Sequence, residues 1–199
     1  MNTPNKLTIA RICIAPVFLA VLLADFPHNF LCAAIIFAAA SVTDAIDGNL
    51  ARKRDQITVF GQLLDPVADK VLTTTAFLAF LQMGLCSVWS VMLILTREFA
   101  VTSMRLIASV QGIVIPAGIS GKIKTAAQMV SIAAILLLGE AVQYVPWFAA
   151  QVELYRTVSF ALVWLTAVLA VVSGVIYFAQ AKKRIDFFKR FAYNDLYRH

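Results

Sequence analysis

Four aspartates lie within 26 residues in the first half of the chain, between two strongly apolar stretches. They are Asp44, Asp47, Asp65 and Asp69. Insertion scales assign roughly 2.5 to 3.5 kcal/mol to a single aspartate at the centre of a membrane helix. Because four of them in an apolar setting are so unfavourable, we interpret these acids as functional residues.

The spacing of the acids favours a metal site. On helices, Asp44 and Asp47 are three residues apart and Asp65 and Asp69 are four apart, so each pair shares one helical face. A short turn between the helices would run them antiparallel and bring the pairs together. Four carboxylates in a low dielectric repel one another unless cations neutralise them. Oxygen ligands of this kind suit Mg²⁺ or Mn²⁺ better than Zn²⁺, and two such ions can clamp the attacking and leaving oxygens of a phosphoryl displacement.

Residues around the acids also favour phosphate chemistry. Gly48 and Gly61 leave room for close approach of a ligand, and Arg52 falls near the helical face of Asp44 and can bind a phosphate bidentately. The alternative is that the acids only form buried ion pairs with neighbouring basic residues such as Lys70. Four acids at this spacing with two glycines and an arginine favour the metal site.

The composition of the chain places these residues in a membrane protein. Of its 199 residues, 61% are hydrophobic and only 14% are charged, whereas a soluble domain has about 45–50% apolar residues and about 25% charged ones. Lipid requires every backbone polar group to be paired within the protein, so long apolar stretches predict helices. Six stretches are long enough: 7–24, 30–52, 62–83, 88–110, 123–145 and 157–180. We predict an all-α membrane protein with six transmembrane helices, formed as a single domain over residues 1–199.

Basic residues predict which end of the helices faces the cytoplasm. The connections after the first and third stretches have no Lys or Arg, and the one after the fifth has only Arg156. The other end collects Lys6, Arg52, Lys53, Arg54, Lys122, Lys124 and six basic residues of the tail. We therefore expect both termini and the acids in the cytoplasm, at a polar active-site cavity that faces it.

Short terminal segments and the net charge of +6 indicate contact with the membrane surface. The tail, residues 182–199, mixes basic and aromatic residues, which is typical of a helix lying in the anionic interface; a frayed basic end that only sets the topology is equally compatible. Residues 3–11 would form a similar interfacial segment or the start of an approach to the site. Headgroups suit this charge better than nucleic acid does, and we expect no nucleic-acid partner. The three isolated cysteines predict neither a disulfide nor a metal site.

The acidic stretch resembles the signature of the CDP-alcohol phosphatidyltransferase family, D-x-x-D-G-x-x-A-R, eight residues, then G-x-x-x-D-x-x-x-D, without departure. This resemblance implies an enzyme that transfers a phosphatidyl group from a CDP-linked lipid, CDP-diacylglycerol, to an alcohol and releases CMP. It implies two divalent cations held by the four aspartates, with Asp69 also as general base, and a homodimer packed through transmembrane helices. Gly48, Arg52, Thr58 and Gly61 would surround the cytidine diphosphate.

Three further segments, 4–18, 96–109 and 120–129, are similar to the branch of the family whose acceptor is sn-glycerol 3-phosphate. Such a dianion requires positive charge near the metal site. The candidates are Arg97, Arg105, Lys122 and Lys124. Arg97 lies well inside an apolar stretch and should point into the bundle, paired with Glu98 or facing a wet cavity. The others could instead serve only to set the topology.

Other acceptors and another class of protein stay open at this point. Inositol phosphate, serine and phosphatidylglycerol are acceptors of related chemistry. A divalent-cation transporter would also use membrane acids, but it would distribute them through the membrane depth and would not place Arg52 among them. In a purely structural subunit nothing would offset the desolvation of the acids. An enzyme in the cytoplasmic membrane of a bacterium is the preferred interpretation.

Overall fold

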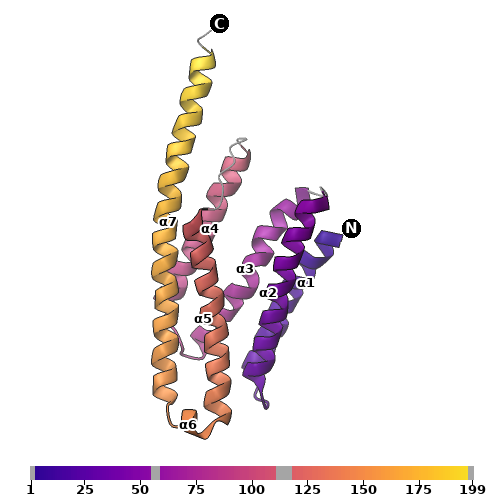
Figure 1. Cartoon of the computed structure of the whole chain (residues 1–199), viewed down its shortest axis with the longest axis vertical. Helices are drawn as coiled ribbons and strands as arrows, with labels where there is room; N and C mark the ends of the chain where they lie inside the picture. Colours follow the sequence, from indigo (N-terminus) through magenta and orange to yellow (C-terminus); the bar gives the residue numbers. More distant parts are fainter. Residues whose placement is uncertain (1–2, 55–58, 111–117, 197–199) are drawn as a thin grey trace.

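The computed structural model describes the backbone of residues 3–54, 59–110 and 118–196, with the side chains of residue 10 and of residues 12–43, 70–108 and 118–182. Within these ranges the chain forms seven helices and no strand (Figure 1). The helices are α1 (Thr3–Leu23), α2 (Asn29–Arg54), α3 (Val59–Gln82), α4 (Val88–Val110), α5 (Ile119–Tyr144), α6 (Pro146–Ala149) and α7 (Val152–Leu196). Each predicted stretch overlaps one of the six long helices, although α7 is much longer than its stretch, and the all-helical prediction is confirmed.

The turns between helices are closed by local hydrogen bonds. At the end of α3, Gly84 has a φ of +70°, and its N–H donates to the Leu81 carbonyl at 3.1 Å while the Leu85 N–H donates to the Phe80 carbonyl at 2.9 Å. This pair of bonds is a Schellman cap, which favours glycine at the left-handed position. Asn29 closes the turn between α1 and α2, because its side-chain amide donates to the Leu22 carbonyl at 3.0 Å.

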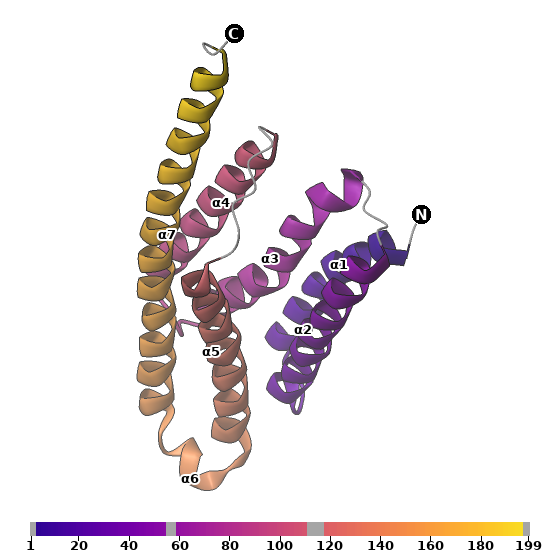
Figure 2. The ribbon, with the colours of Figure 1, turned by 45° about the horizontal axis from the view of Figure 1, so that its top comes forward.

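The helices pack around one main apolar core. Helix α1 lies against both α2 and α3, α5 lies against α2 and α7, and α4 lies against α7 (Figure 2). All six long helices contribute at least one fully or almost fully buried side chain to the core: Phe18, Phe37, Phe77, Ile94, Ile132 and Val163. Between helices surrounded by lipid, such side chains stabilise the fold through close van der Waals packing. The core therefore fixes the positions of α1 to α5 and α7 relative to one another.

Two helices in the described part of the chain meet the length and apolarity required to cross a membrane. They are Ile119–Tyr144, which is α5, and Val152–Lys182, most of α7. Only 33% and 39% of their apolar windows are buried inside the protein, whereas the core helix of a soluble protein would be mostly buried. The outward apolar surface of these helices is suited to lipid.

The end of the chain differs from the expected separate interfacial segment. Helix α7 runs for 45 residues to Leu196, so the basic and aromatic tail continues the last helix beyond the others (Figure 1). The sequence contains neither glycine nor proline after Gly174, and nothing therefore stops the helix at the end of its apolar part. The amino-terminal segment is likewise part of α1.

Candidate active site

The four aspartates belong to two helices that meet at one end of the molecule (Figure 2). Asp44 and Asp47 are in the last three turns of α2, and Asp65 and Asp69 are in the first three turns of α3. Residues 55–58 join the two helices, so the helix ends lie within roughly 18 Å of each other at about 3.5 Å per residue. At a rise of 1.5 Å per residue, Asp47 and Asp65 are about 10 Å from the ends of their helices, and Asp44 and Asp69 about 15 Å. The two pairs thus lie at similar distances from the joined ends of their helices.

The side chains of the predicted metal and CDP sites lie outside the described residues. This applies to Asp44, Asp47, Gly48, Arg52, Thr58, Gly61, Asp65 and Asp69. Among the side chains that are described, no group of three or more acids, histidines or cysteines could hold a metal ion. The metal site stays a prediction, and its chemical fit rests on a donor set of four carboxylates, which are ligands for hard divalent cations.

A cluster of polar side chains begins one residue after Asp69. We call it the Glu98 cluster; its members are Lys70, Arg97, Glu98, Thr102, Lys124 and Ser173. The Lys70 ammonium lies 3.5 Å from Glu98 Oε2 and donates to the Glu98 backbone carbonyl at 2.9 Å. Glu98 Oε1 accepts a hydrogen bond from Arg97 Nη1 at 3.3 Å and another from Lys124 Nζ. One carboxylate therefore contacts three cations.

Four helices bring the cluster together. Lys70 comes from α3, Arg97 and Glu98 from α4, and Lys124 from α5. Helix α7 contributes Ser173, whose hydroxyl accepts a hydrogen bond from Arg97 Nη2 at 2.7 Å. Close approach of α4 and α7 depends on Gly174, because a Cβ there would lie 3.0 Å from Arg97 Cγ.

The cluster is buried and brings cations together. The side chain of Lys124 is 3% exposed, and those of Arg97 and Glu98 are each 12% exposed. Buried charges are retained only when they are paired, and Arg97 and Lys124 both pair with the same oxygen of Glu98. Two cations at one carboxylate oxygen suit the binding of an anionic ligand.

The structure brings together two of the four basic residues predicted to bind the acceptor. Arg97 and Lys124 meet at Glu98, and the predicted pairing of Arg97 with Glu98 is confirmed. Lys122 is exposed on α5. Arg105 is exposed on α4, with its guanidinium 5.8 Å from the centre of the Tyr177 ring.

Sequence reasoning did not identify Lys70 as a candidate for the acceptor site. Its ammonium reaches Glu98 and Thr102, which are 28 and 32 residues further along the chain. The available signal was its position directly after Asp69. The helix packing that turns it toward α4 cannot be inferred from that position alone.

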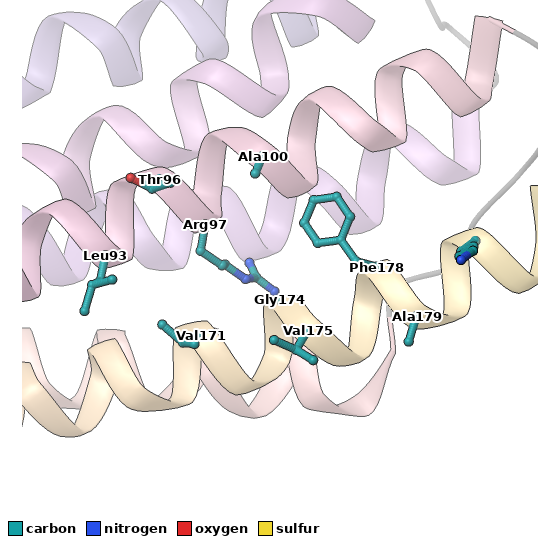
Figure 3. A pocket seen from close by; sticks show the side chains of 10 residues that line it. Leu93, Thr96, Arg97, Ala100, Val171, Gly174, Val175, Phe178 and Ala179 are labelled. Atoms are coloured by element: carbon teal, nitrogen blue, oxygen red, sulfur yellow. The ribbon is translucent and has the colours of Figure 1, made fainter.

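An apolar groove of about 560 Å³ lies between α4 and α7 (Figure 3). Leu93 and Ala100 of α4 and Val171 and Phe178 of α7 are among its lining residues, and the stem of Arg97 forms part of its wall. This groove is apolar and differs from the polar cavity predicted at the aspartates. Arg97 is thus a member of the Glu98 cluster that also borders an apolar surface.

Comparison with known proteins gives consistent results over most of the chain. The profile of the family described as CDP-alcohol phosphatidyltransferase matches residues 1–172. A Bacillus subtilis protein named CDP-diacylglycerol–glycerol-3-phosphate 3-phosphatidyltransferase is 39% identical over 191 residues, covering 90% of this chain and 94% of that protein. A Rickettsia bellii protein of the same name is 34% identical over 92% of this chain and 96% of its own. A Mycobacterium tuberculosis protein named probable phosphatidylglycerophosphate synthase is 41% identical over 68% of this chain and 66% of its own.

Proposed function

Because the chain belongs to the CDP-alcohol phosphatidyltransferase family, we propose that it transfers a phosphatidyl group from CDP-diacylglycerol to sn-glycerol 3-phosphate. The products are phosphatidylglycerophosphate and CMP. The observation that carries the choice of acceptor is the positive charge of Arg97 and Lys124 in the Glu98 cluster, where both buried cations contact one oxygen of Glu98. A phosphate monoester is a dianion and complements that charge, whereas serine has no net negative charge to do so.

The donor site is assigned to the ends of α2 and α3. Asp44, Asp47, Asp65 and Asp69 would hold two divalent cations, Mg²⁺ or Mn²⁺. When bound, such cations neutralise a pyrophosphate and stabilise the leaving group. Gly48, Arg52, Thr58 and Gly61 would surround the cytidine diphosphate, with the guanidinium of Arg52 binding a phosphate bidentately.

The reaction requires a proton acceptor beside the acceptor hydroxyl. The oxygen of the acceptor hydroxyl attacks the phosphorus of the phosphatidyl group, and Asp69 takes the proton of that hydroxyl. The new phosphorus–oxygen bond replaces the bond to the CMP phosphate, and the electron pair of the broken bond leaves with CMP. Arg97 and Lys124 bind the phosphate of the acceptor and hold its hydroxyl toward Asp69.

The site is assigned to the cytoplasmic surface of a bacterial membrane. Six helices, α1 to α5 and α7, would span the bilayer as a single domain, with both termini in the cytoplasm. Membrane lipids surround the helices, and a homodimer packed through α3 and α4 is the expected assembly. In this arrangement a lipid-borne donor and a water-soluble acceptor reach the aspartates from two sides.

The purified protein in detergent with CDP-diacylglycerol tests this function. We expect CMP release only with a divalent cation and with sn-glycerol 3-phosphate, and none after addition of EDTA. Glycerol, serine, inositol phosphate and phosphatidylglycerol serve as comparison acceptors. CMP release that depends on one of these, or divalent-cation flux in proteoliposomes without CMP release, would contradict the proposal.

A further inference from the structure

Glu98 is the common partner of three cations that come from different helices. Its Oε1 atom accepts hydrogen bonds from both Arg97 and Lys124, and its Oε2 atom lies 3.5 Å from the Lys70 ammonium. Its backbone carbonyl also accepts from Lys70 at 2.9 Å and from Thr102 Oγ1 at 2.7 Å. No other carboxylate enters the cluster among the described side chains.

The cations depend on this carboxylate for their positions. Arg97 and Lys124 contact the same oxygen, so their nitrogens lie close together in a buried region. Two like charges at that separation repel each other strongly in a low dielectric. Without the carboxylate between them, the two side chains would turn apart, and their donors would no longer converge.

The cations also keep unused hydrogen-bond donors. A guanidinium has five N–H donors and an ammonium has three, and the contacts described take up two on Arg97 and one on Lys124. The Nε of Arg97 is buried and has no partner among the described residues. A phosphate with three acceptor oxygens could bind these donors while the carboxylate stays in place.

We propose that Glu98 is the positioning residue of the acceptor site, holding Arg97 and Lys124 so that their remaining donors converge on the phosphate of the acceptor. This inference rests on the proposed function. Glu98 does not touch the reacting atoms; it acts through these two cations. Selectivity for a phosphorylated acceptor therefore depends on the same residue.

The test is a set of kinetic constants for Glu98→Gln and Glu98→Asp in the full-length protein. Gln keeps the size of the side chain but cannot neutralise the cations. We expect KM for sn-glycerol 3-phosphate to rise roughly 10- to 100-fold, the effect of losing one hydrogen bond to a charged group, while KM for CDP-diacylglycerol changes less than about twofold. Asp restores the charge at a shorter reach and should recover part of the loss.

Glu140→Gln provides a matched control. Glu140 is also a partly buried, hydrogen-bonded carboxylate, 15% exposed, but it lies at the opposite end of α5 from Lys124. This change should lower thermal stability and leave both KM values unaltered. Equal changes in kcat and both KM values for Glu98→Gln, or loss of folding in both Glu98 variants, would show that Glu98 only supports the fold and would overturn the inference.

A double-mutant cycle separates positioning from an independent effect. If Glu98 acts through Lys124, adding Glu98→Gln to Lys124→Ala should raise KM little further, because neighbours that act together are not additive. Full additivity would contradict the inference. Failure of the wild-type protein to release CMP with sn-glycerol 3-phosphate would instead contradict the proposed function itself, so the two failures are distinguishable.

Discussion

At the scale of single residues, Asp69 has two tasks in the proposed reaction. It is expected to bind a cation and to accept the proton of the attacking hydroxyl. A carboxylate has two oxygens, so one can contact the cation while the other faces the hydroxyl. Lys70, the next residue, extends toward Glu98. Two adjacent residues of α3, Asp69 and Lys70, thus connect the predicted metal site to the Glu98 cluster.

The change Asp69→Asn tests the role of Asp69 as base. Asparagine keeps a carbonyl oxygen for the cation but cannot take a proton at neutral pH. We expect kcat to fall by about 10²- to 10⁴-fold, the contribution of a positioned general base. The fold and the stabilisation of the protein by Mn²⁺, measured by thermal melting with and without the ion, should persist. Near-normal turnover of this variant would refute the assignment of the base.

At the scale of helices, hydropathy was sufficient to predict where the long helices lie. The predicted stretch 88–110 and helix α4 (Val88–Val110) have the same bounds, and the turn at Gly84 precedes the start of both. The length of α7 was not predicted, because its tail is polar and contains no residue that clearly ends a helix. The Glu98 cluster was predicted only in its local part, Arg97 with Glu98. Its contacts to Lys124 and Ser173 span 26 and 76 residues and depend on helix packing.

A second polar contact fastens the connection between α1 and α2 to α5. His28 Nδ1 and Glu140 Oε1 are 2.5 Å apart, and Glu140 Oε2 accepts a hydrogen bond from the Leu31 N–H at 3.1 Å. The Tyr144 ring stacks on His28 at 4.0 Å, and its hydroxyl accepts from the His28 N–H at 2.8 Å. Because the carboxylate sits at the first turn of α2, it also complements the positive end of that helix.

Glu140→Gln should therefore destabilise the fold without altering substrate binding. The amide can keep only part of the contacts of the carboxylate, and we expect a loss of ~1–2 kcal/mol in the free energy of unfolding. Thermal or denaturant unfolding in detergent micelles measures it. Glu153→Gln is the matched control: that carboxylate is 85% exposed and 3.7 Å from the exposed Arg156, so the change should stay within about 0.5 kcal/mol. Equal effects of the two changes would contradict a role for the Glu140 contact.

At the scale of the whole molecule, basic residues are concentrated at one end of the helices. The amino end of α1, the carboxyl ends of α2, α4 and α7 and the amino ends of α3 and α5 all lie toward one end of the molecule (Figure 1). The opposite end carries the connections after α1, α3 and α5, which contain no Lys or Arg; Arg156 lies close by, in the second turn of α7. Two exposed tryptophans, Trp89 and Trp147, also belong to that opposite end, as expected for residues at a membrane interface. This asymmetry supports placing the acids on the cytoplasmic side.

Labelling from one side of the membrane tests that orientation. In a variant without Cys13, Cys32 and Cys86, single cysteines are introduced by Ile119→Cys or Glu153→Cys, both at highly exposed positions on opposite ends of the molecule. A membrane-impermeant maleimide added to right-side-out vesicles should label the variant at position 153 at once. The variant at position 119 should react only after the vesicles are permeabilised. The reverse pattern would place the aspartates outside the cytoplasm, away from the supply of a phosphorylated acceptor, and would contradict the proposed arrangement of the two substrates.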